Sequence, residues 1–189
     1  MHKSRGKLIV FEGGDRSGKT TQSRLLQQAI PDSVLLRYPD RTTPLGQLLN
    51  SFLAGKTEFT PAVSNLLFIA SLWQTLEEAN KHLDEGRTVI MDRYTTSCFV
   101  YSLLRGVDPQ QLKTLLGGMP EPTVTFFLDV DPKQSSQRGD FGQEIYDSVE
   151  YQTKVRNEFL KIPRDFNWIT IDAAQSIEAV QANILQNIN

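Results

Sequence analysis

The residues most able to do chemistry lie in the stretch EGGDRSGKTT, at positions 12–21. Gly13, Gly18, Lys19 and Thr20 follow the spacing G-x-x-x-x-G-K-T, between an apolar strand pattern and an amphipathic helix pattern. At this spacing, backbone N–H groups surround a phosphate, the lysine reaches its terminal oxygens, and the threonine hydroxyl can ligate Mg²⁺. The stretch therefore predicts a phosphate-binding loop. The alternative, a glycine-rich turn with a chance Lys-Thr pair, fits the strand and helix context poorly.

Two residues inside the loop carry charges that a phosphate site does not require. Asp15 places a carboxylate near bound phosphates, which is unfavourable unless it serves another group, and a sugar hydroxyl would suit it. Arg16 places a permanent cation over the phosphates, where it could stabilise charge on a group in transfer. A solvated loop arginine is the alternative for Arg16. Both charges are therefore candidates for a role in the chemistry.

Further charges stand where two other predicted strands end. TVIMDRY is apolar until Asp92, a carboxylate that can hold Mg²⁺ through water or accept a proton, and Arg93, which can bind a phosphate. A surface ion pair is the alternative for these two residues. Arg41, in YPDRT, adds a cation after the preceding strand. Two arginines and a phosphate loop predict two phosphorylated ligands that face each other, as in phosphoryl transfer between nucleotides. The sequence has no Asn-Lys-x-Asp motif of a guanine-specific GTPase.

These residues must be positioned by elements whose hydrophobic patterns alternate between strand and helix. Nearly continuous apolar runs predict strands buried on both faces at 7–12, 33–38, 88–93, 123–130 and 168–172. Helical spacing predicts helices at 18–30, 61–85, 143–162 and 176–188. Such alternation is typical of a doubly wound α/β fold with a parallel sheet and helices on both faces. Ligands then bind beyond the carboxyl ends of the strands.

The bulk properties limit the class of protein. A chain of 189 residues suits a single domain, residues 1–189, and a formal net charge of −2 argues against a protein that mainly binds nucleic acid. The single cysteine, Cys98, excludes an internal disulfide and fits a reducing compartment. No apolar run reaches the ~18 residues that cross a bilayer, and the N-terminus lacks a signal-peptide pattern. We therefore expect a cytoplasmic protein, or in a eukaryote one that is also nuclear, with no membrane partner.

Six segments, taken in order, resemble the motifs of one family. They are VFEGGDRSGKTTQSRLL, YPDRTTPLGQLL, LLFIASLW, VIMDRY, QRGDFGQEIYD and DAAQSIEAV, and together they resemble the thymidylate kinase (dTMP kinase) family over nearly the whole chain. The resemblance implies a P-loop nucleoside monophosphate kinase fold of class α/β, with a five-stranded parallel sheet, helices on both faces and a short lid at about 138–152. It implies transfer of the γ-phosphate of ATP to dTMP, giving dTDP and ADP in dTTP biosynthesis. It also implies Mg²⁺ as cofactor, ATP and dTMP as small-molecule ligands, and a homodimer.

The resemblance also implies roles for single residues of the acceptor site. Asp15 matches the carboxylate that binds the 3′-hydroxyl of the acceptor sugar. Arg41 and Arg93 match the arginines that hold the 5′-phosphate of the acceptor. Tyr146 and Gln152 match lid-side residues that cover the acceptor.

Two aromatic residues match the rings that contact the base and the sugar. Phe68 matches the ring that stacks on thymine, and Tyr101 the ring that crowds the 2′ position and so favours deoxyribose. The implied dTMP-binding residues are Asp15, Tyr38, Arg41, Phe68, Leu72, Arg93, Ser97, Tyr101, Tyr146 and Gln152. The implied ATP-binding residues are Gly13, Gly14, Asp15, Arg16, Ser17, Gly18, Lys19, Thr20 and Thr21. The implied catalytic residues are Arg16, Lys19, Asp92 and Arg93, and the implied metal ligands are Thr20 and Asp92.

The lid segment favours one subtype of the family. Residues 139–153 contain four acidic residues and no Lys or Arg, and Arg138 lies just before them. The lid therefore does not readily supply the catalytic cation, which leaves Arg16 of the phosphate loop in that role. The sequence resembles the P-loop-arginine type, whose eukaryotic and poxviral members share an RGxFGxExY-like lid.

One position departs from the family pattern. Leu72 stands where the family usually has an arginine that hydrogen-bonds the thymine O4 carbonyl, and it lies four residues after Phe68, on the same helix face. We expect Leu72 to line the base pocket without donating a hydrogen bond. In one interpretation Ser71, Thr96, Ser97 or a water replaces the lost contact. In the other, base selectivity is relaxed.

Three functions therefore stay open at this point. The first is a dTMP kinase. The second is a kinase of the same architecture for dUMP, another nucleotide or a deoxynucleoside; Leu72 supports it, although a nucleoside would leave Arg41 and Arg93 without a phosphate to bind. The third is a nucleotide-binding protein without turnover, which the retained Lys19 and Asp92 disfavour.

Overall fold

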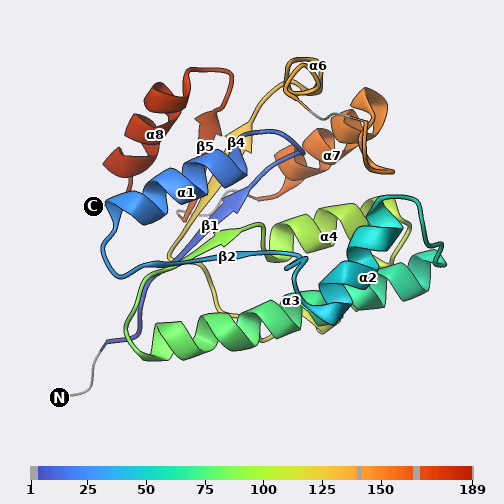
Figure 1. Cartoon of the computed structure of the whole chain (residues 1–189), viewed down its shortest axis with the longest axis horizontal. Helices are drawn as coiled ribbons and strands as arrows, with labels where there is room; N and C mark the ends of the chain where they lie inside the picture. The colour runs from blue at the N-terminus through green and yellow to red at the C-terminus, as the bar shows by residue number, and fades with distance from the viewer. Residues whose placement is uncertain (1–3, 140–141, 164–166, 189) are drawn as a thin grey trace.

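A parallel sheet of five strands forms the centre of the structure (Figure 1). The computed structural model describes residues 4–139, 142–163 and 167–188. The strands are β1 (Leu8–Glu12), β2 (Val34–Arg37), β3 (Val89–Asp92), β4 (Val124–Asp129) and β5 (Trp168–Asp172). Their order across the sheet is β2-β3-β1-β4-β5, and every neighbouring pair runs parallel. The predicted sheet is therefore confirmed, with each strand end within one residue of its expected position.

Helices cover both faces of the sheet. They are α1 (Lys19–Ala29), α2 (Pro44–Leu53), α3 (Pro61–Asp84), α4 (Thr95–Leu104), α5 (Pro109–Leu116), α6 (Pro132–Ser135), α7 (Val149–Lys161) and α8 (Ile177–Gln186). α1 and α8 lie side by side on one face, and α2, α3 and α4 lie on the other, with α7 beside α4 (Figure 1). None of the helices in the described part of the chain is long and apolar enough to span a membrane. Helices on both faces confirm the predicted doubly wound fold.

Alternate side chains of the central strand β1 contribute to two separate cores. Leu8 and Val10 point to one side and pack in a cluster with the buried face of α3. Ile9 and Phe11 point to the opposite side and pack in a cluster with residues of α1 and α8. All four side chains are at most 2% exposed. Because both faces of the strand are covered by helices, each of these positions is apolar, and the sequence shows a continuous run instead of an alternating one.

The two edge strands depart from the prediction of five fully buried strands. β1 and β3 are buried at every residue, and β4 at all but its last. In contrast, β2 has three half-buried residues followed by an exposed Arg37, and in β5 only Ile171 is buried. An edge strand has a neighbour on one side only, so an apolar run does not by itself guarantee complete burial.

The helix predicted at 143–162 begins only at Val149. Ser148 is its N-cap, and the Ser148 hydroxyl accepts a hydrogen bond from a first-turn backbone N–H at 3.1 Å. Upstream, the Asp147 carboxylate accepts from the backbone N–H groups of residues 143 and 144, each at 3.2 Å. Asp and Ser side chains here satisfy backbone donors that a helix would pair with carbonyls, so 143–148 forms turns instead.

Four helices, α2, α4, α5 and α6, lie outside the predicted ranges. Three of them begin with a capping residue followed by proline: Thr43-Pro44, Asp108-Pro109 and Asp131-Pro132. In each, the cap side chain accepts a hydrogen bond from a backbone N–H of the first turn, so these start signals were present in the sequence. α4 has no capping side chain at its own N-cap, Tyr94, and is capped by a residue of another element.

Candidate active site

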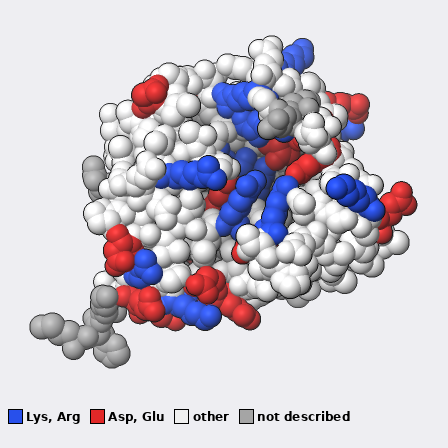
Figure 2. Space-filling model, viewed as in Figure 1, with Lys and Arg blue, Asp and Glu red and all other residues white. Residues whose placement is uncertain are grey.

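A cleft of about 440 Å³ opens beyond the carboxyl ends of the strands. Figure 2 shows Lys and Arg side chains gathered around a hollow in the middle of the viewed face. Among the described residues, seven cations and three carboxylates line the cleft, an excess of four positive charges in a chain whose net charge is −2. Such a cleft favours anionic ligands. The charged residues are Arg16, Lys19, Arg37, Arg41, Arg93, Arg105 and Arg138, with Asp15, Asp92 and Glu144.

The predicted phosphate loop connects β1 to α1. Gly13 has a φ of 144°, and a Cβ there would lie 2.7 Å from the Leu128 carbonyl oxygen, so only glycine fits. Lys19 Nζ donates to the Gly14 carbonyl oxygen at 2.5 Å. Burial, followed by the nearby charge of Arg93, lowers the Lys19 pKa to about 7. A bound phosphate would supply the negative charge that this buried ammonium needs.

Most residues predicted for the ATP site lie on the surface of the cleft. The segment from Asp15 to Thr21 lines it, whereas Gly13 and Gly14 lie outside the lining and shape the turn behind it. The N-cap of α1 is Gly18, with a φ of 102°, a left-handed conformation that other residues rarely adopt. The loop therefore presents side chains and the start of α1 to the cleft, while its glycines allow the backbone path.

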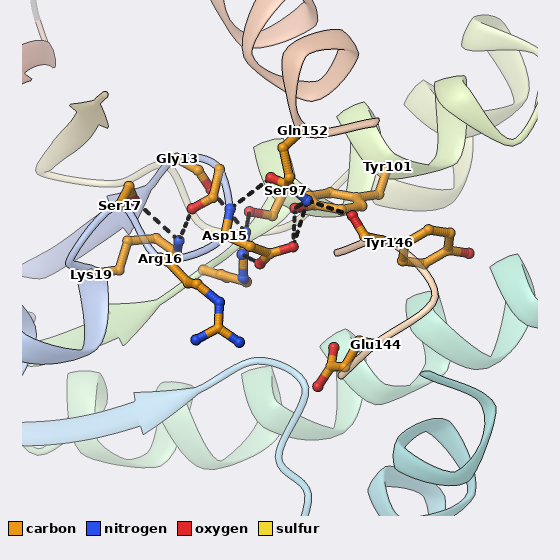
Figure 3. A network of polar contacts seen from close by, with 12 residues as sticks. Gly13, Asp15, Arg16, Ser17, Lys19, Ser97, Tyr101, Glu144, Tyr146 and Gln152 are labelled. Atoms are coloured by element: carbon orange, nitrogen blue, oxygen red, sulfur yellow. Dashed lines mark hydrogen bonds and ion pairs between the residues drawn. The ribbon is translucent and has the colours of Figure 1, made fainter. Parts of the chain in front are cut away.

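Asp15 is the centre of a partly buried polar network (Figure 3). Its carboxylate accepts hydrogen bonds from Arg93, with which it forms an ion pair, from Tyr101 Oη at 3.0 Å and from Gln152 Nε2 at 2.7 Å. Burial by itself would raise the Asp15 pKa, but the charges of Arg93 and Lys19 outweigh burial and lower that pKa. Three protein donors thus stabilise an ionised carboxylate beside the phosphate loop.

Gln152 and Tyr101 hold this carboxylate in place. Gln152 lies on α7, is 1% exposed, and also accepts from the Asp15 backbone N–H at 2.8 Å through its Oε1. Gln152 does not line the cleft, so it positions Asp15, whereas the resemblance implied a lid-side residue over the acceptor. Tyr101 does line the cleft. Burial, followed by the Asp15 charge, raises the Tyr101 pKa, so its hydroxyl keeps the proton that it donates.

Glu12, the last residue of β1, lies outside the predicted site but organises it. Its fully buried carboxylate accepts from the N–H groups of Tyr94 at 3.1 Å and Ser97 at 3.0 Å, and from the Ser97 hydroxyl. It thereby caps the N-terminus of α4 from the central strand. Burial raises the Glu12 pKa, although the hydrogen bonds from Ser97 oppose the shift. A glutamate that ends an apolar strand is rare enough to have marked this residue in the sequence.

Arg93 joins the phosphate loop to α4. Its Nη1 donates to the Gly13 carbonyl oxygen and to Ser97 Oγ, each at 3.0 Å, in addition to the ion pair with Asp15. Its φ of 74° is unusual for a residue with a side chain, and these contacts hold the residue in that conformation. The Arg93 side chain is only 13% exposed, so the alternative of a surface ion pair is wrong.

The two predicted metal ligands lie together at the floor of the cleft. Thr20 Oγ1 donates to Asp92 Oδ2 at 2.6 Å, and Asp92 is 3% exposed. A hydroxyl and a carboxylate, completed by water and phosphate oxygens, are ligands that suit Mg²⁺. In the described part of the chain, no group of three or more His, Cys, Asp or Glu side chains is placed to hold a metal. These residues fit an ion that arrives with nucleotide phosphates better than one that the protein holds alone.

The predicted lid contacts two of the predicted phosphate-binding arginines. Arg16, with a φ of 60°, donates to the Gly139 carbonyl oxygen and to Asp147 Oδ2, the latter at 3.5 Å. Figure 3 shows its side chain extending away from the Asp15 network. Arg41 Nη2 donates to Glu144 Oε1 at 2.6 Å. The segment predicted as a lid therefore contributes Glu144 and Tyr146 to the lining of the cleft; residues 140 and 141 of this segment are outside the described residues.

Aromatic side chains line one end of the cleft, which we call the aromatic end. Tyr38, Phe68, Tyr101 and Tyr146 all line it. Leu72 does not, since it is fully buried in the core cluster of α3, and the expectation that it lines the base pocket is wrong. Four residues along a helix keep the same face but move about 6 Å along the axis. That displacement takes Leu72 from the edge of the cleft into the core.

Three arginines of the cleft lie outside the predicted set. Arg37 ends β2, with its Nε 3.9 Å from Asp92 Oδ2, and a charged strand end could have marked it, as it marked Arg93. Arg138 donates to two backbone carbonyl oxygens, each at 2.8 Å, one of them in the phosphate loop. Arg105 is the C-cap of α4, a helix outside the predicted ranges, so its place in the cleft was not visible in the sequence.

Comparisons with known proteins agree on one family. A family model described as Thymidylate kinase matches residues 11–184. The thymidylate kinase of Schizosaccharomyces pombe is 35% identical over 99% of this chain and 93% of its own, and that of Danio rerio is 37% identical over 97% and 90%. A solved structure of thymidylate kinase from Candida albicans, an enzyme described as having broad substrate specificity, superposes with a TM-score of 0.87 at 33% identity. The superposition covers 97% of this chain and 91% of the Candida albicans chain.

Proposed function

Since the chain belongs to the thymidylate kinase family, we propose that the cleft described above is where the γ-phosphoryl group passes from ATP to dTMP. The activity of the chain is that of a dTMP kinase, an ATP-dependent phosphotransferase. The observation that supports this site is the presence, in one cleft, of a phosphate loop, an excess of four positive charges and an aromatic end. Phosphoryl transfer needs cations around the transferred group, and an aromatic surface suits a base.

At the donor end, Lys19 and Arg16 neutralise the triphosphate. Lys19 lies inside the loop, and its contact with the Gly14 carbonyl is exchanged for phosphate oxygens. Arg16 exchanges its contacts with the lid residues Gly139 and Asp147 for the γ-phosphoryl group. Both cations stabilise the charge that spreads over the phosphoryl oxygens in the transition state. Catalysis is then positional and electrostatic, without a covalent intermediate on the protein.

Mg²⁺ is the cofactor that these residues fit. Thr20 and Asp92 would hold it, directly or through water, together with phosphate oxygens of ATP. Such an ion would neutralise negative charge on the phosphate groups. Asp92 is held in place by the Thr20 hydroxyl, so the carboxylate is aimed before a ligand arrives.

At the acceptor end, Arg41 and Arg93 bind the 5′-phosphate of dTMP. Phe68 stacks on the base, and Tyr101 crowds the 2′ position of the sugar. Asp15 Oδ2 already has two donors and Oδ1 one, so Oδ1 retains a free lone pair for the 3′-hydroxyl. The two arginines hold the attacking phosphate in line with the γ-phosphoryl group.

The lid, the assembly and the location complete the proposal. Residues 1–189 act as a single P-loop kinase domain in which the lid, about 138–152, closes over both nucleotides and excludes water, because hydrolysis of ATP is the competing reaction. The chain acts as a homodimer in the cytoplasm, and in a eukaryote also in the nucleus. Its partners are ATP and dTMP, with no nucleic acid and no membrane.

The test is a coupled assay of ATP consumption with Mg²⁺ and a panel of acceptors: dTMP, dUMP, UMP, dCMP, dGMP and thymidine. We expect turnover with dTMP and none with thymidine, because Arg41 and Arg93 have no phosphate to bind in a nucleoside. ATP binding without product from any monophosphate would favour the alternative of a nucleotide-binding protein. Consumption of ATP without an acceptor measures the hydrolysis background.

A second candidate is a pyrimidine deoxynucleotide kinase with relaxed base selectivity. The observation that favours it is the burial of Leu72, which leaves the usual base-contacting position without a polar group in the cleft. The similar Candida albicans enzyme is described as having broad substrate specificity. Comparable kcat/KM values for dTMP and dCMP in the same panel would support this candidate, and a strong preference for dTMP would exclude it.

A further inference from the structure

Arg105 lies at the aromatic end of the cleft, thirty-three positions from the residue that the family pattern assigns to the base. Its guanidinium covers the Phe68 ring, with Cζ 4.8 Å from the ring centre, and it lies 6.0 Å from the centre of the Tyr146 ring. A base that packs against the Phe68 ring beside this guanidinium therefore has N–H donors next to its edge. Arginine N–H groups are donors without an acceptor, so they suit a carbonyl oxygen.

We propose that Arg105 is the residue that determines base specificity: it donates a hydrogen bond to a carbonyl oxygen on the edge of the acceptor base and so selects keto pyrimidines over amino pyrimidines. This inference rests on the proposed function, in which the acceptor base lies against Phe68. The hydrogen bond from Arg105 would take the place of the base contact that the family pattern assigns to position 72, where the buried Leu72 has no donor.

The other groups considered for this contact are poorly placed for it. Ser71 is 1% exposed, and neither Ser71 nor Thr96 lines the cleft. Ser97 lines the cleft, but its hydroxyl proton is donated to Glu12 and its oxygen accepts from Arg93. A base would have to break one of these bonds to use Ser97, whereas the Arg105 guanidinium already contacts the Phe68 ring and has a weakly bound N–H donor.

Arg105 is held by residues of two helices. Asn65 Oδ1 accepts from Nε at 3.2 Å and also from Nη2, and Ser102 Oγ accepts from Nη2 at 3.2 Å. Asn65 is 3% exposed, and its Nδ2 is buried without a hydrogen-bond partner among the described residues. An unpaired buried amide is unfavourable, and the charge-assisted bonds to Arg105 offset that cost. The orientation of Asn65 is therefore set by the arginine that it positions.

One side of the guanidinium remains available for a ligand. Nε and Nη2 are occupied by Asn65 and Ser102, whereas Nη1 makes a single long contact, 3.4 Å to Tyr146 Oη. An arginine has five N–H donors, and the described contacts use at most four of them. Because the guanidinium is rigid, the base must bring its carbonyl oxygen to Nη1, while Nε and Nη2 stay bonded to Asn65 and Ser102.

The chemistry of the bases sets the expected selectivity. dTMP and dUMP present the carbonyl oxygen O4, which accepts from Nη1, whereas dCMP presents an amino group, which would face a donor with another donor. A substrate that leaves a buried polar group of the site unpaired is rejected strongly. A substrate that differs only by a methyl group is rejected far less strongly. Arg105 therefore discriminates against dCMP and has no means of separating dTMP from dUMP.

The experiment compares kcat/KM for dTMP, dUMP and dCMP in the wild type and two variants, Arg105→Leu and Arg105→Gln. We expect the dTMP-to-dCMP ratio to fall at least 10-fold in Arg105→Leu, mainly through a higher KM for dTMP, since one lost charge-assisted hydrogen bond is worth about that factor. The dTMP-to-dCMP ratio should also fall in Arg105→Gln, because the glutamine amide can donate to O4 of dTMP and can equally accept from the dCMP amino group. The dTMP-to-dUMP ratio should stay unchanged in both variants. Arg24→Leu, at an exposed position of α1 outside the cleft, is the matched control.

Each outcome separates the inference from the proposed function. A variant that loses efficiency for dTMP and dCMP equally, with their ratio unchanged, would show that Arg105 only supports the fold, and would overturn the inference. A wild type without turnover on dTMP would overturn the proposed function; the affinities of dTMP and dCMP, measured by calorimetry in the same proteins, then test the inference alone. Thermal unfolding shows which variants fold, and Arg105→Gln keeps a donor for Asn65 if Arg105→Leu does not.

Discussion

Single residues in this cleft serve several neighbours at once, and Arg93 is the clearest example. Its guanidinium binds the Asp15 carboxylate, the Gly13 carbonyl oxygen and Ser97 Oγ. The positive charge of Arg93 lowers the pKa of Asp15 and that of Lys19, so it keeps one group ionised and makes the other easier to deprotonate. A change at Arg93 therefore alters the loop, the acceptor side and the local charge together, whereas Arg16 contacts the lid.

Arg16→Ala and Arg93→Ala should have different effects. Arg16→Ala should lower kcat on the order of 10³-fold with little change in the KM for dTMP, because an arginine over the γ-phosphoryl group acts mainly in the transition state. Arg93→Ala should raise the KM for dTMP and also destabilise the fold by about 3 kcal/mol, because it leaves the Asp15 carboxylate without its ion-pair partner. Steady-state kinetics and denaturant unfolding measure both effects.

Arg24→Ala, at an exposed position outside the cleft, is the control for general effects of losing an arginine. The opposite kinetic pattern, with Arg16→Ala weakening dTMP binding and Arg93→Ala sparing it, would reverse the two assignments.

The lowered pKa of Lys19 predicts proton uptake when ATP binds. In the free protein this pKa is about 7, so at pH 8.5 the amine is largely neutral. Bound phosphates raise the pKa again, and the complex should take up about one proton per site. Affinity for ATP should accordingly decrease as pH rises above 7. Calorimetry at pH 8.5 in buffers of different ionisation enthalpy measures the number of protons.

Lys19→Arg is the matched variant for this measurement, because a guanidinium stays charged across this range and takes up no proton. Equal proton uptake in the wild type and in Lys19→Arg would assign the uptake to another group and contradict the role of Lys19.

At the scale of elements, α4 gathers three side chains of the cleft on one face. Ser97, Tyr101 and Arg105 follow each other at intervals of four residues, and all three line the cleft. The N-terminus of this helix is fixed by Glu12 from β1, and its C-terminal arginine by Asn65 from α3. Two neighbouring elements thus set the position of the helix that carries these side chains.

The segment proposed as a lid makes an ion pair that would compete with the proposed acceptor phosphate. Glu144 accepts from Arg41 at 2.6 Å, and the two side chains are 28% and 36% exposed. Glu144→Gln should strengthen dTMP binding roughly three-fold, because Arg41 no longer has to leave a charged partner, while the fold loses less than about 1 kcal/mol. Calorimetric titration with dTMP measures the effect. Glu150→Gln, at an exposed carboxylate paired with Lys154, is the control. If dTMP binds more weakly to Glu144→Gln but not to Glu150→Gln, Glu144 would instead serve to close the proposed lid.

At the scale of the whole molecule, the two cores on either side of the sheet leave the carboxyl edge of the strands open. The hydrophobic clusters on the α3 face and on the α1 and α8 face fix the sheet from both sides. Charged residues that end or follow the strands then meet at one edge, which is why a chain with a net charge of −2 has a cationic cleft. Figure 2 shows further acidic side chains at the margins of the viewed face, away from the cleft.

The outer face of α3 predicts how two chains associate. Val63, Leu66 and Trp73 are 43%, 55% and 40% exposed on this helix, which is unusual for large apolar side chains close together. If this face forms the proposed homodimer, sedimentation of the wild type should give a mass twice the chain mass of 21.4 kDa. Leu66→Glu should sediment as a monomer, because a charge there would be buried without a partner.

Leu185→Glu, at an apolar residue of α8 that is 39% exposed, should leave the dimer intact. Sedimentation velocity measures all three proteins. A wild type that sediments as a monomer at concentrations of about 50 µM would contradict the homodimer, since obligate interfaces bind far more tightly.

The sequence by itself determined the fold class and the donor side of the site. Continuous apolar runs require helices on both faces of the central strands, and a phosphate loop between a strand and a helix can fold in few ways, so local pattern was sufficient there. The Ser148 cap of α7 was also present as a residue type in the sequence, although the prediction from helical spacing began this helix at 143. Where an element was capped by its own residues, its start was present in the sequence.

Tertiary structure decided what depends on groups far apart in the chain. Glu12 caps α4 across 82 to 85 residues, and Arg105 reaches Asn65 across 40, so no local pattern marks either contact. The same reason explains why Leu72 was wrongly expected in the cleft: helical spacing gives the face of α3, but the boundary between cleft and core along that face depends on what packs against it. Burial and long-range charge are properties of the assembled chain, because they depend on every element that surrounds a residue.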